Sequence, residues 1–146
     1  MKNIKKICLI LCVCSLTPLL WNCEKADEEF VHDSNIISQM ICKAAHGSSE
    51  FRGVISEFDK SGNALPAGFK QQDAEGGYGI VLFEISKSLQ DDVNLANIYL
   101  VATLTWDQSI TPSLSGRHDI TGDGIIITVK SGVGTERQYR IRGVYQ

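Results

Sequence analysis

The chain has 146 residues, of which 14 are basic and 17 are acidic, and its formal net charge is −3. Proteins that bind nucleic acid need a clustered basic surface to neutralise phosphates, and this composition does not provide one. We therefore exclude nucleic acid as a partner. The stretch 34–146 has the usual size of one domain, so we expect a single hydrophobic core there.

The first 22 residues predict a signal peptide. Three lysines within the first six positions form a cationic start, and residues 7–20 form an apolar segment. This segment is shorter than the roughly 20 residues that cross a bilayer. Pro18 also interrupts it, so cleavage is favoured over a permanent membrane helix. We expect residues 1–22 to be absent from the mature protein.

The tetrapeptide Leu20-Trp21-Asn22-Cys23 resembles the lipobox of bacterial lipoproteins, in the looser form typical of the Bacteroidetes. The resemblance implies that Cys23 is lipidated, and two or three acyl chains hold a protein stably on a membrane. The acidic run that follows resembles the signal that sends such lipoproteins to the outer face of the outer membrane. We therefore expect a lipid-anchored, surface-exposed outer-membrane protein. The alternative is a secreted protein cut elsewhere, with Cys23 incidental.

Residues 23–33 predict a short tether between the lipid and the domain. The tether is poor in large apolar groups and rich in acids, which are Glu24, Asp27, Glu28, Glu29 and Asp33. Removal of the leader leaves 11 basic and 17 acidic residues, a formal net charge of −6. The tether is therefore expected to be a solvated spacer.

Cys42 is the only cysteine in the stretch 34–146, so the domain cannot form an internal disulfide. Exported small domains often rely on disulfides, and this one must instead be stabilised by its hydrophobic core. Met40 and Ile41 precede Cys42 and predict a buried, unreactive thiol.

Six runs of β-branched and aromatic residues, separated by glycine-containing turns, predict six strands. The runs are 35–43, 51–58, 78–86, 98–106, 124–130 and 137–142. Residues 64–74 and 87–95 sustain no helical period, so we expect both to be loops. Regularly spaced strands in a domain of this length favour an all-β fold, an antiparallel two-sheet sandwich.

The last two runs predict a C-terminal β-hairpin with one apolar face. Alternation along the strands places five side chains on the inward face: Ile125, Ile127, Val129, Tyr139 and Ile141. Gln138, Arg140 and Arg142 then point outward. The hairpin should therefore contribute one wall of the core.

A series of short motifs runs from residue 92 to the last strand. They are Asp92-Val93-Asn94-Leu95, Ala102-Thr103-Leu104, a Thr-Pro loop that ends in glycine at 110–116, Asp119-Ile120, the strand 125–129 and Tyr139-Arg140-Ile141. Together they resemble the Ig-like repeat common in Bacteroides surface lipoproteins, and residues 34–90 fit its N-terminal half more loosely. The resemblance implies an Ig-like sandwich. The family's function is generally unassigned, so no active site is implied.

No motif of the sequence predicts catalysis or a metal site. The turn from Asp119 to Asp123 and Gly124 imitates the start of a calcium loop, but Lys130 occupies the position of the closing carboxylate. The three histidines (His32, His46 and His118) lack the spacing of a zinc site, and no serine lies in a Gly-x-Ser-x-Gly elbow. We therefore predict a non-enzymatic protein with no cofactor and no metal.

Trp106 is the candidate ligand contact, with Asp107 and Gln108 beside it. An exposed indole can stack on a sugar ring while polar neighbours bind the sugar hydroxyls. The alternative is a core or rim tryptophan that closes one end of the sandwich.

The export signature and the lack of catalytic groups favour a non-catalytic binding or adhesion module whose ligand is a glycan or an envelope protein. The alternative function is a structural or scaffolding subunit of an envelope complex with no small-molecule ligand. The sequence indicates no oligomeric state.

Overall fold

A computed structural model describes residues 31–45 and 49–146 of the chain. The predicted signal peptide, Cys23 and the tether up to residue 30 lie outside the described residues, as does His46. One compact unit spans His32–Gln146, so His32 and Asp33 belong to this unit. Within the described residues, no helix has the length and apolarity that a membrane crossing requires.

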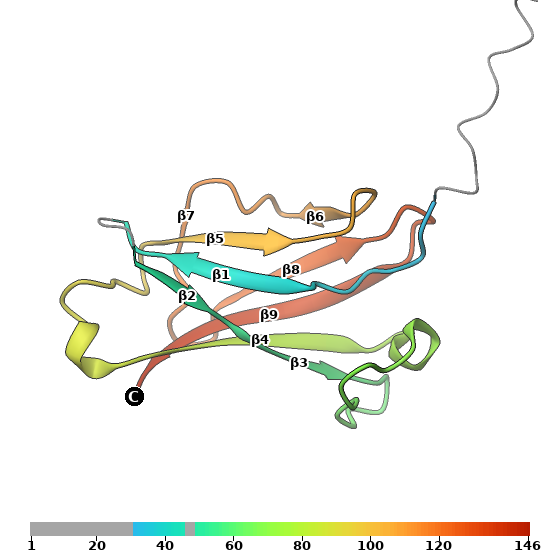
Figure 1. Cartoon of the computed structure of the whole chain (residues 1–146), viewed down its shortest axis with the longest axis horizontal. Helices are drawn as coiled ribbons and strands as arrows, with labels where there is room; N and C mark the ends of the chain where they lie inside the picture. Colours follow the sequence, from blue (N-terminus) through green and yellow to red (C-terminus); the bar gives the residue numbers. More distant parts are fainter. Residues whose placement is uncertain (1–30, 46–48) are drawn as a thin grey trace, which may run out of the picture. The chain divides into compact units, whose positions relative to one another are not determined.

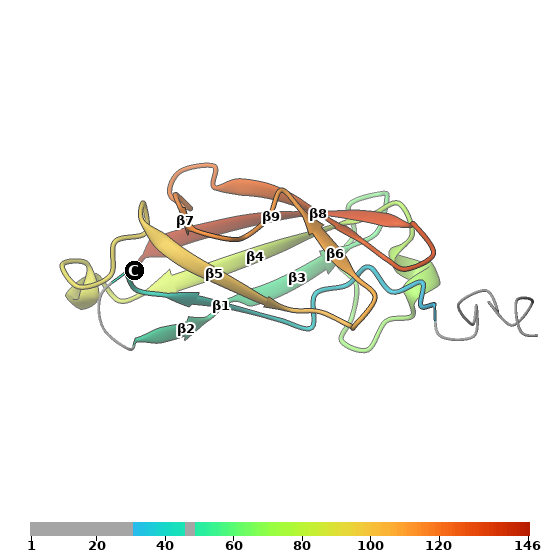
Figure 2. The same ribbon diagram turned by 90° about the horizontal axis from the view of Figure 1, so that it is seen from above.

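The described residues form nine strands in two sheets that pack together (Figures 1 and 2). The strands are β1 (Gln39–Lys43), β2 (Glu50–Arg52), β3 (Val54–Phe58), β4 (Tyr78–Ile85), β5 (Ile98–Thr103), β6 (Ser109–Thr111), β7 (Arg117–His118), β8 (Ile125–Lys130) and β9 (Glu136–Tyr145). The sheet orders are β2-β1-β5-β7 and β3-β4-β9-β8-β6. The predicted all-β, two-sheet sandwich is confirmed.

The five-stranded sheet is mixed, because β4 and β9 pair in parallel from Tyr78 with Gln138 to Ile85 with Tyr145. The other strand pairs of both sheets in the described residues are antiparallel. The expectation of a purely antiparallel sandwich is therefore wrong at this one pair. A parallel pair needs a long crossover, here through four intervening strands, and local turn signals do not reveal such a connection.

Each of the six predicted runs overlaps a strand, and three further strands complete the sheets. The run 51–58 divides at Gly53 into β2 and β3, which belong to different sheets. Strands β6 and β7 have three and two residues, too few for a recognisable alternation. The stretches predicted as loops each contain a single 3-10 turn, η3 (Gln71–Ala74) and η4 (Lys87–Leu89), and Ala64 of the first forms an isolated bridge with Phe58.

The C-terminal hairpin faces the core as its alternation predicts. Ile127, Val129, Tyr139 and Ile141 are fully buried between the sheets, and Ile125 packs at the edge of the same cluster.

Cys42 is buried in this core as predicted, and burial raises the pKa of its thiol to about 12. The thiol therefore stays protonated at neutral pH, the unreactive form.

Candidate functional site

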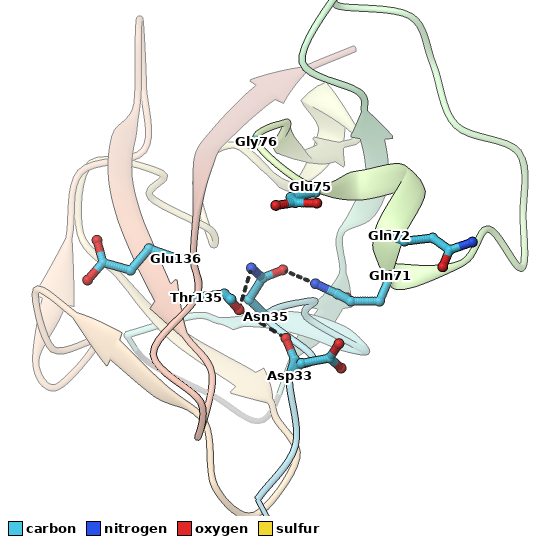
Figure 3. Close-up of a pocket in the computed structure, with 8 residues that line it drawn as sticks. All are labelled: Asp33, Asn35, Gln71, Gln72, Glu75, Gly76, Thr135 and Glu136. Carbon is cyan, nitrogen blue, oxygen red and sulfur yellow. Dashed lines mark hydrogen bonds between the residues drawn. The ribbon is translucent and has the colours of Figure 1, made fainter.

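Three shallow depressions adjoin one another at one end of the sandwich, and Gly76 lines all of them. Their volumes are about 250, 420 and 410 Å³. The first is lined by Asp33, Asn35, Gln71, Gln72, Glu75, Gly76, Thr135 and Glu136 (Figure 3). The other two add Asp59, Lys60, Ser61, Asp73, Gly77, Tyr78, Thr128 and Gln138. We call this continuous surface the Gly76 groove.

The turn from η3 into β4 shapes the groove and requires glycine at two successive positions. Gly76 has a φ of +69°, a left-handed conformation that side chains with a Cβ rarely adopt. A Cβ on Gly77 would lie 2.0 Å from the carbonyl oxygen of Phe58, so the backbone of the turn packs directly on the end of β3. The Gly-Gly pair that reads as a turn signal in the sequence thus forms the centre of the groove.

Amide side chains form the floor of the first depression (Figure 3). Buried Asn35 donates from Nδ2 to Thr135 Oγ1 at 3.3 Å, and its Oδ1 accepts from Gln71 Nε2 at 2.8 Å. Thr135 Oγ1 in turn donates to the carbonyl oxygen of Asp33 at 3.0 Å. These bonds join three segments that are distant in the sequence, and they fix the orientation of the amides.

Gln71 also carries an unused acceptor. Its Oε1 is buried and has no hydrogen-bond partner among the described residues. A buried acceptor without a donor is unfavourable, because it loses its bond to water and gains nothing in return. Gln71 itself lines the first depression, so its amide belongs to the surface that a ligand would meet.

Beneath the groove lies a buried ion pair between Arg137 of β9 and Glu57 of β3. Arg137 is 2 % exposed, and its Nε donates to Glu57 Oε2 at 2.8 Å. Its Nη2 donates to the carbonyl oxygens of Phe58 and Tyr78, each at 2.9 Å, and its Nη1 donates to that of Ala74. Because these carbonyls flank the turn at Gly76, the guanidinium holds the groove backbone from the core side.

Tyr139 completes this network. Its hydroxyl donates to Glu57 Oε1 at 2.6 Å and accepts the backbone N–H of Ile37 at 3.1 Å. Burial, and then the neighbouring Glu57 charge, raises the pKa of the Tyr139 phenol and keeps it neutral. The Glu57 carboxylate thereby connects β3 with β9, and the Tyr139 hydroxyl extends this connection to the segment before β1.

The groove is acidic. Its described lining contains five carboxylates and one ammonium group: Asp33, Asp59, Asp73, Glu75 and Glu136, against Lys60. The Asp59 carboxylate accepts from the side-chain amide of Asn63, which lowers its pKa and keeps it charged. Electrostatic complementarity therefore favours neutral or cationic ligands over anionic ones.

Two surface loops use their leading aspartates locally, and one of them is the turn from Asp119 that imitates the start of a calcium loop. Asp59 accepts from the backbone of Ser61 and Asn63, and Asp119 accepts from both the N–H and the hydroxyl of Thr121. In the ranges 31–45 and 49–146, no three or more His, Cys, Asp or Glu side chains form a group that could hold a metal ion.

Trp106, Asp107 and Gln108 lie in the loop between β5 and β6. Trp106 is 70 % exposed, so it is not a core tryptophan, and its ring packs edge-on against His32. Asp107 accepts the backbone N–H of His32, which lowers the pKa of this carboxylate. Gln108 Nε2 donates to the carbonyl oxygen of Ser34 at 2.6 Å. Both polar neighbours thus bind the chain's own segment, and only the indole remains free to meet a ligand.

The sequence predicts neither the groove nor the ion pair below it. A signal for the ion pair was present: Arg137 shares the inward parity of Tyr139 and Ile141, and Glu57 shares that of Ile55. Opposite charges at inward positions imply a buried pair, because an unpaired buried charge is too costly. The groove has no comparable signal, since its walls come from segments far apart in the chain.

Comparisons of the chain with protein-family models, with curated proteins and with solved structures find no match. The likeness to Ig-like surface lipoproteins thus stays a prediction. The chemistry of the groove is the remaining basis for a functional proposal.

Proposed function

We propose that this chain is a lipid-anchored protein of the outer-membrane surface that acts as a non-catalytic, glycan-binding module, with the Gly76 groove as its binding surface. The observation that carries the proposal is the polar lining of the groove, in which the amides of Asn35 and Gln71 are held in a fixed orientation. The anchor is Cys23, on the strength of the lipobox.

The groove has the chemistry that sugar hydroxyls require. Planar amides both donate to and accept from sugar hydroxyls, and carboxylates accept from them. Gln72, Glu75 and Glu136 are exposed for this purpose. Tyr78 is 42 % exposed at one side of the groove and offers an apolar surface to a sugar ring, although one ring face stacks on Phe58. Three adjoining depressions suit an oligosaccharide better than a single sugar.

We propose binding without catalysis. The described lining of the groove contains no histidine or cysteine that could form a nucleophile with a base, and its carboxylates make glycoside hydrolysis a reaction that the test must include. The hydroxyl of Thr135 donates to a carbonyl oxygen rather than to a base. Turnover by the purified protein on a panel of glycoside and ester substrates would contradict this part of the proposal.

A glycan array followed by calorimetric titration tests the binding surface. The variant Gln72→Ala/Glu75→Ala removes two exposed groove side chains, and Gln90→Ala/Glu84→Ala is the matched control outside the groove. We expect the groove variant to weaken binding at least about tenfold, equivalent to 1.4 kcal/mol, and the control to leave it unchanged. Equal effects of the two variants, or no glycan bound by the wild type, would refute the assignment.

The anchor and the surface location need separate tests. With Cys23→Ala the protein should lose labelling by a palmitate analogue and should appear as soluble protein or uncleaved precursor. Labelling that persists in this variant would refute the anchor. Protease treatment of intact cells should digest a surface-displayed domain and spare one that faces the periplasm.

A scaffolding role is the second candidate, and the outer face of the five-stranded sheet favours it. Val54 of β3 and Ile126 of β8 are 58 % and 47 % exposed there, and Leu82 of β4 is adjacent to Val54. Exposed apolar groups on one sheet face are typical of protein contacts. Cross-linking in intact envelopes would recover a specific partner if this role is correct, and glycan binding would then be absent.

A further inference from the structure

Two strongly exposed apolar side chains gather around His32, the residue at which the compact unit begins. Trp106 is 70 % exposed and Val133, in the turn between β8 and β9, is 54 % exposed. The Trp106 and His32 rings meet at right angles with their centroids 5.5 Å apart, and the Val133 N–H donates to the His32 carbonyl oxygen at 3.3 Å. We call these three residues the His32 patch.

The backbone of the patch is already satisfied within the unit. The His32 N–H donates to Asp107 and its carbonyl oxygen accepts from Val133. The Asp107 carboxylate also lies 3.4 Å from His32 Nδ1, and its side chain is only 9 % exposed. The patch therefore presents an indole, an isopropyl group and a half-exposed imidazole to its surroundings, and the Asp107 carboxylate is turned inward.

The chain length between the patch and the anchor limits where the patch can be. Eight residues separate Cys23 from His32. A fully extended chain of this length spans at most about 30 Å, which is no more than the thickness of a bilayer's hydrocarbon core. A lipid anchor at Cys23 would therefore keep the membrane surface within reach of the patch at all times.

We propose that the His32 patch rests in the headgroup layer of the membrane that holds the Cys23 acyl chains, with Trp106 as the interfacial anchor. This inference depends on the lipidation of Cys23 proposed above. Tryptophan suits this layer because its ring is apolar and its N–H is polar. Because the acyl chains already confine the patch, a weak contact is sufficient to orient the domain.

The contact has a consequence for the Gly76 groove. Residues 32–36 run from the patch to the groove, where Asp33 and Asn35 form part of the lining. Figure 1 shows this segment, the turn between β8 and β9 and the η3 region at the same end of the sandwich. A membrane-bound patch would turn this end toward the lipid, so a ligand would approach the groove along the membrane surface.

Tryptophan fluorescence tests the proposal directly, because Trp106 is the only tryptophan of residues 23–146. The full-length gene product, purified from membranes, is reconstituted into phosphatidylethanolamine and phosphatidylcholine vesicles whose acyl chains are brominated near the headgroup. We expect the bromolipid to quench at least about half of the emission. We also expect quenching by iodide in the water to be at least about twofold weaker than for the Trp21→Phe/Cys23→Ala protein in solution, which carries Trp106 alone whether or not its leader is cleaved.

Two matched substitutions identify the surface that makes the contact. Val133→Asp places a charge in the patch, and Val54→Asp places the same charge at a similarly exposed valine on β3, outside the patch. We expect Val133→Asp to reduce bromolipid quenching at least about twofold and Val54→Asp to leave it unchanged. Thermal unfolding of both variants verifies that the fold is intact.

The intact mass separates the failure of this inference from the failure of the anchor. An acylated protein whose Trp106 shows no bromolipid quenching, or whose quenching responds equally to both substitutions, refutes the membrane contact and leaves the anchor standing. A protein without acyl groups on Cys23, or one that retains Trp21, refutes both.

Discussion

Arg137 and Arg140 are three positions apart on β9 and have opposite surroundings. Arg137 faces the core, where Glu57 and three backbone carbonyls accept its hydrogen bonds. Arg140 lies on the outer face between Ile80 and Ile126 and donates to the carbonyl oxygen of Asp123 at 3.0 Å. The difference shows that strand parity, and not residue type, determines which charge is structural.

The largest effect is expected for Arg137→Met. The substitution leaves the Glu57 carboxylate buried without its partner and removes the donor from three carbonyls near the groove. Breaking a buried pair in this way costs about 3–5 kcal/mol, which urea unfolding would measure. The double variant Arg137→Met/Glu57→Gln should recover part of the loss. A loss below about 1 kcal/mol for the single variant would show that the pair does not stabilise the fold.

Ile127→Ala tests the apolar part of the same inward face. Ile127 is fully buried between the sheets, so its truncation removes apolar burial and leaves a cavity. We expect a loss of about 2–5 kcal/mol in the free energy of unfolding. The fold contains no disulfide to compensate, because Cys42 is the free, buried cysteine of the described residues.

Tyr139→Phe removes the hydroxyl and keeps the ring, so it tests the contribution of the hydroxyl alone. The ring keeps its packing, while Glu57 Oε1 loses a donor and the Ile37 N–H loses its acceptor. Unsatisfied buried groups of this kind cost about 1–3 kcal/mol. An unchanged free energy of unfolding, measured with urea, would mean that water or a rearranged Glu57 side chain replaces the hydroxyl.

Cys42 should make stability depend on pH in the alkaline range. Because burial raises the pKa of its thiol from 9.0 to about 12, the unfolded chain loses this proton at a lower pH than the folded protein. The contribution is complete below pH 9.0 and is lost as the pH rises toward about 12. Relative to Cys42→Ala, the wild type should lose at most about 1.4 kcal/mol per pH unit above pH 9. Parallel pH profiles for the two proteins between pH 8 and 10 would contradict the burial of this thiol.

The sequence predicts the fold where the information is local. The alternation from Ile125 to Val129 and the following glycine turn identify the C-terminal hairpin and its inward face. The parallel pairing of β4 with β9 depends on strands that are about sixty residues apart, and no local pattern encodes it. The two-residue strand β7 likewise exists only because β5 offers it a partner.

The candidate site was less accessible to prediction than the fold. Exposed Trp106 was identified by its residue type, but its polar neighbours turn out to bind the segment 32–36. The groove is assembled from the segments 33–35, 59–61, 71–78 and 135–138 together with Thr128, and none of these segments has a binding motif of its own. Polar residues in loops are common, and only their convergence in space makes them a surface with a shared chemistry.

The smallest effect is expected for Arg140→Ala, and it completes the comparison with Arg137. Arg140 bonds a single carbonyl oxygen, that of exposed Asp123, and water can replace this bond when the guanidinium is removed. No buried charge loses a partner. We expect the free energy of unfolding to change by less than about 0.5 kcal/mol, measured by urea unfolding beside Ile127→Ala. If Arg140→Ala were the more damaging of the two substitutions, the inward and outward faces of the hairpin would be reversed, and the buried pair between Arg137 and Glu57 would be incompatible with that register.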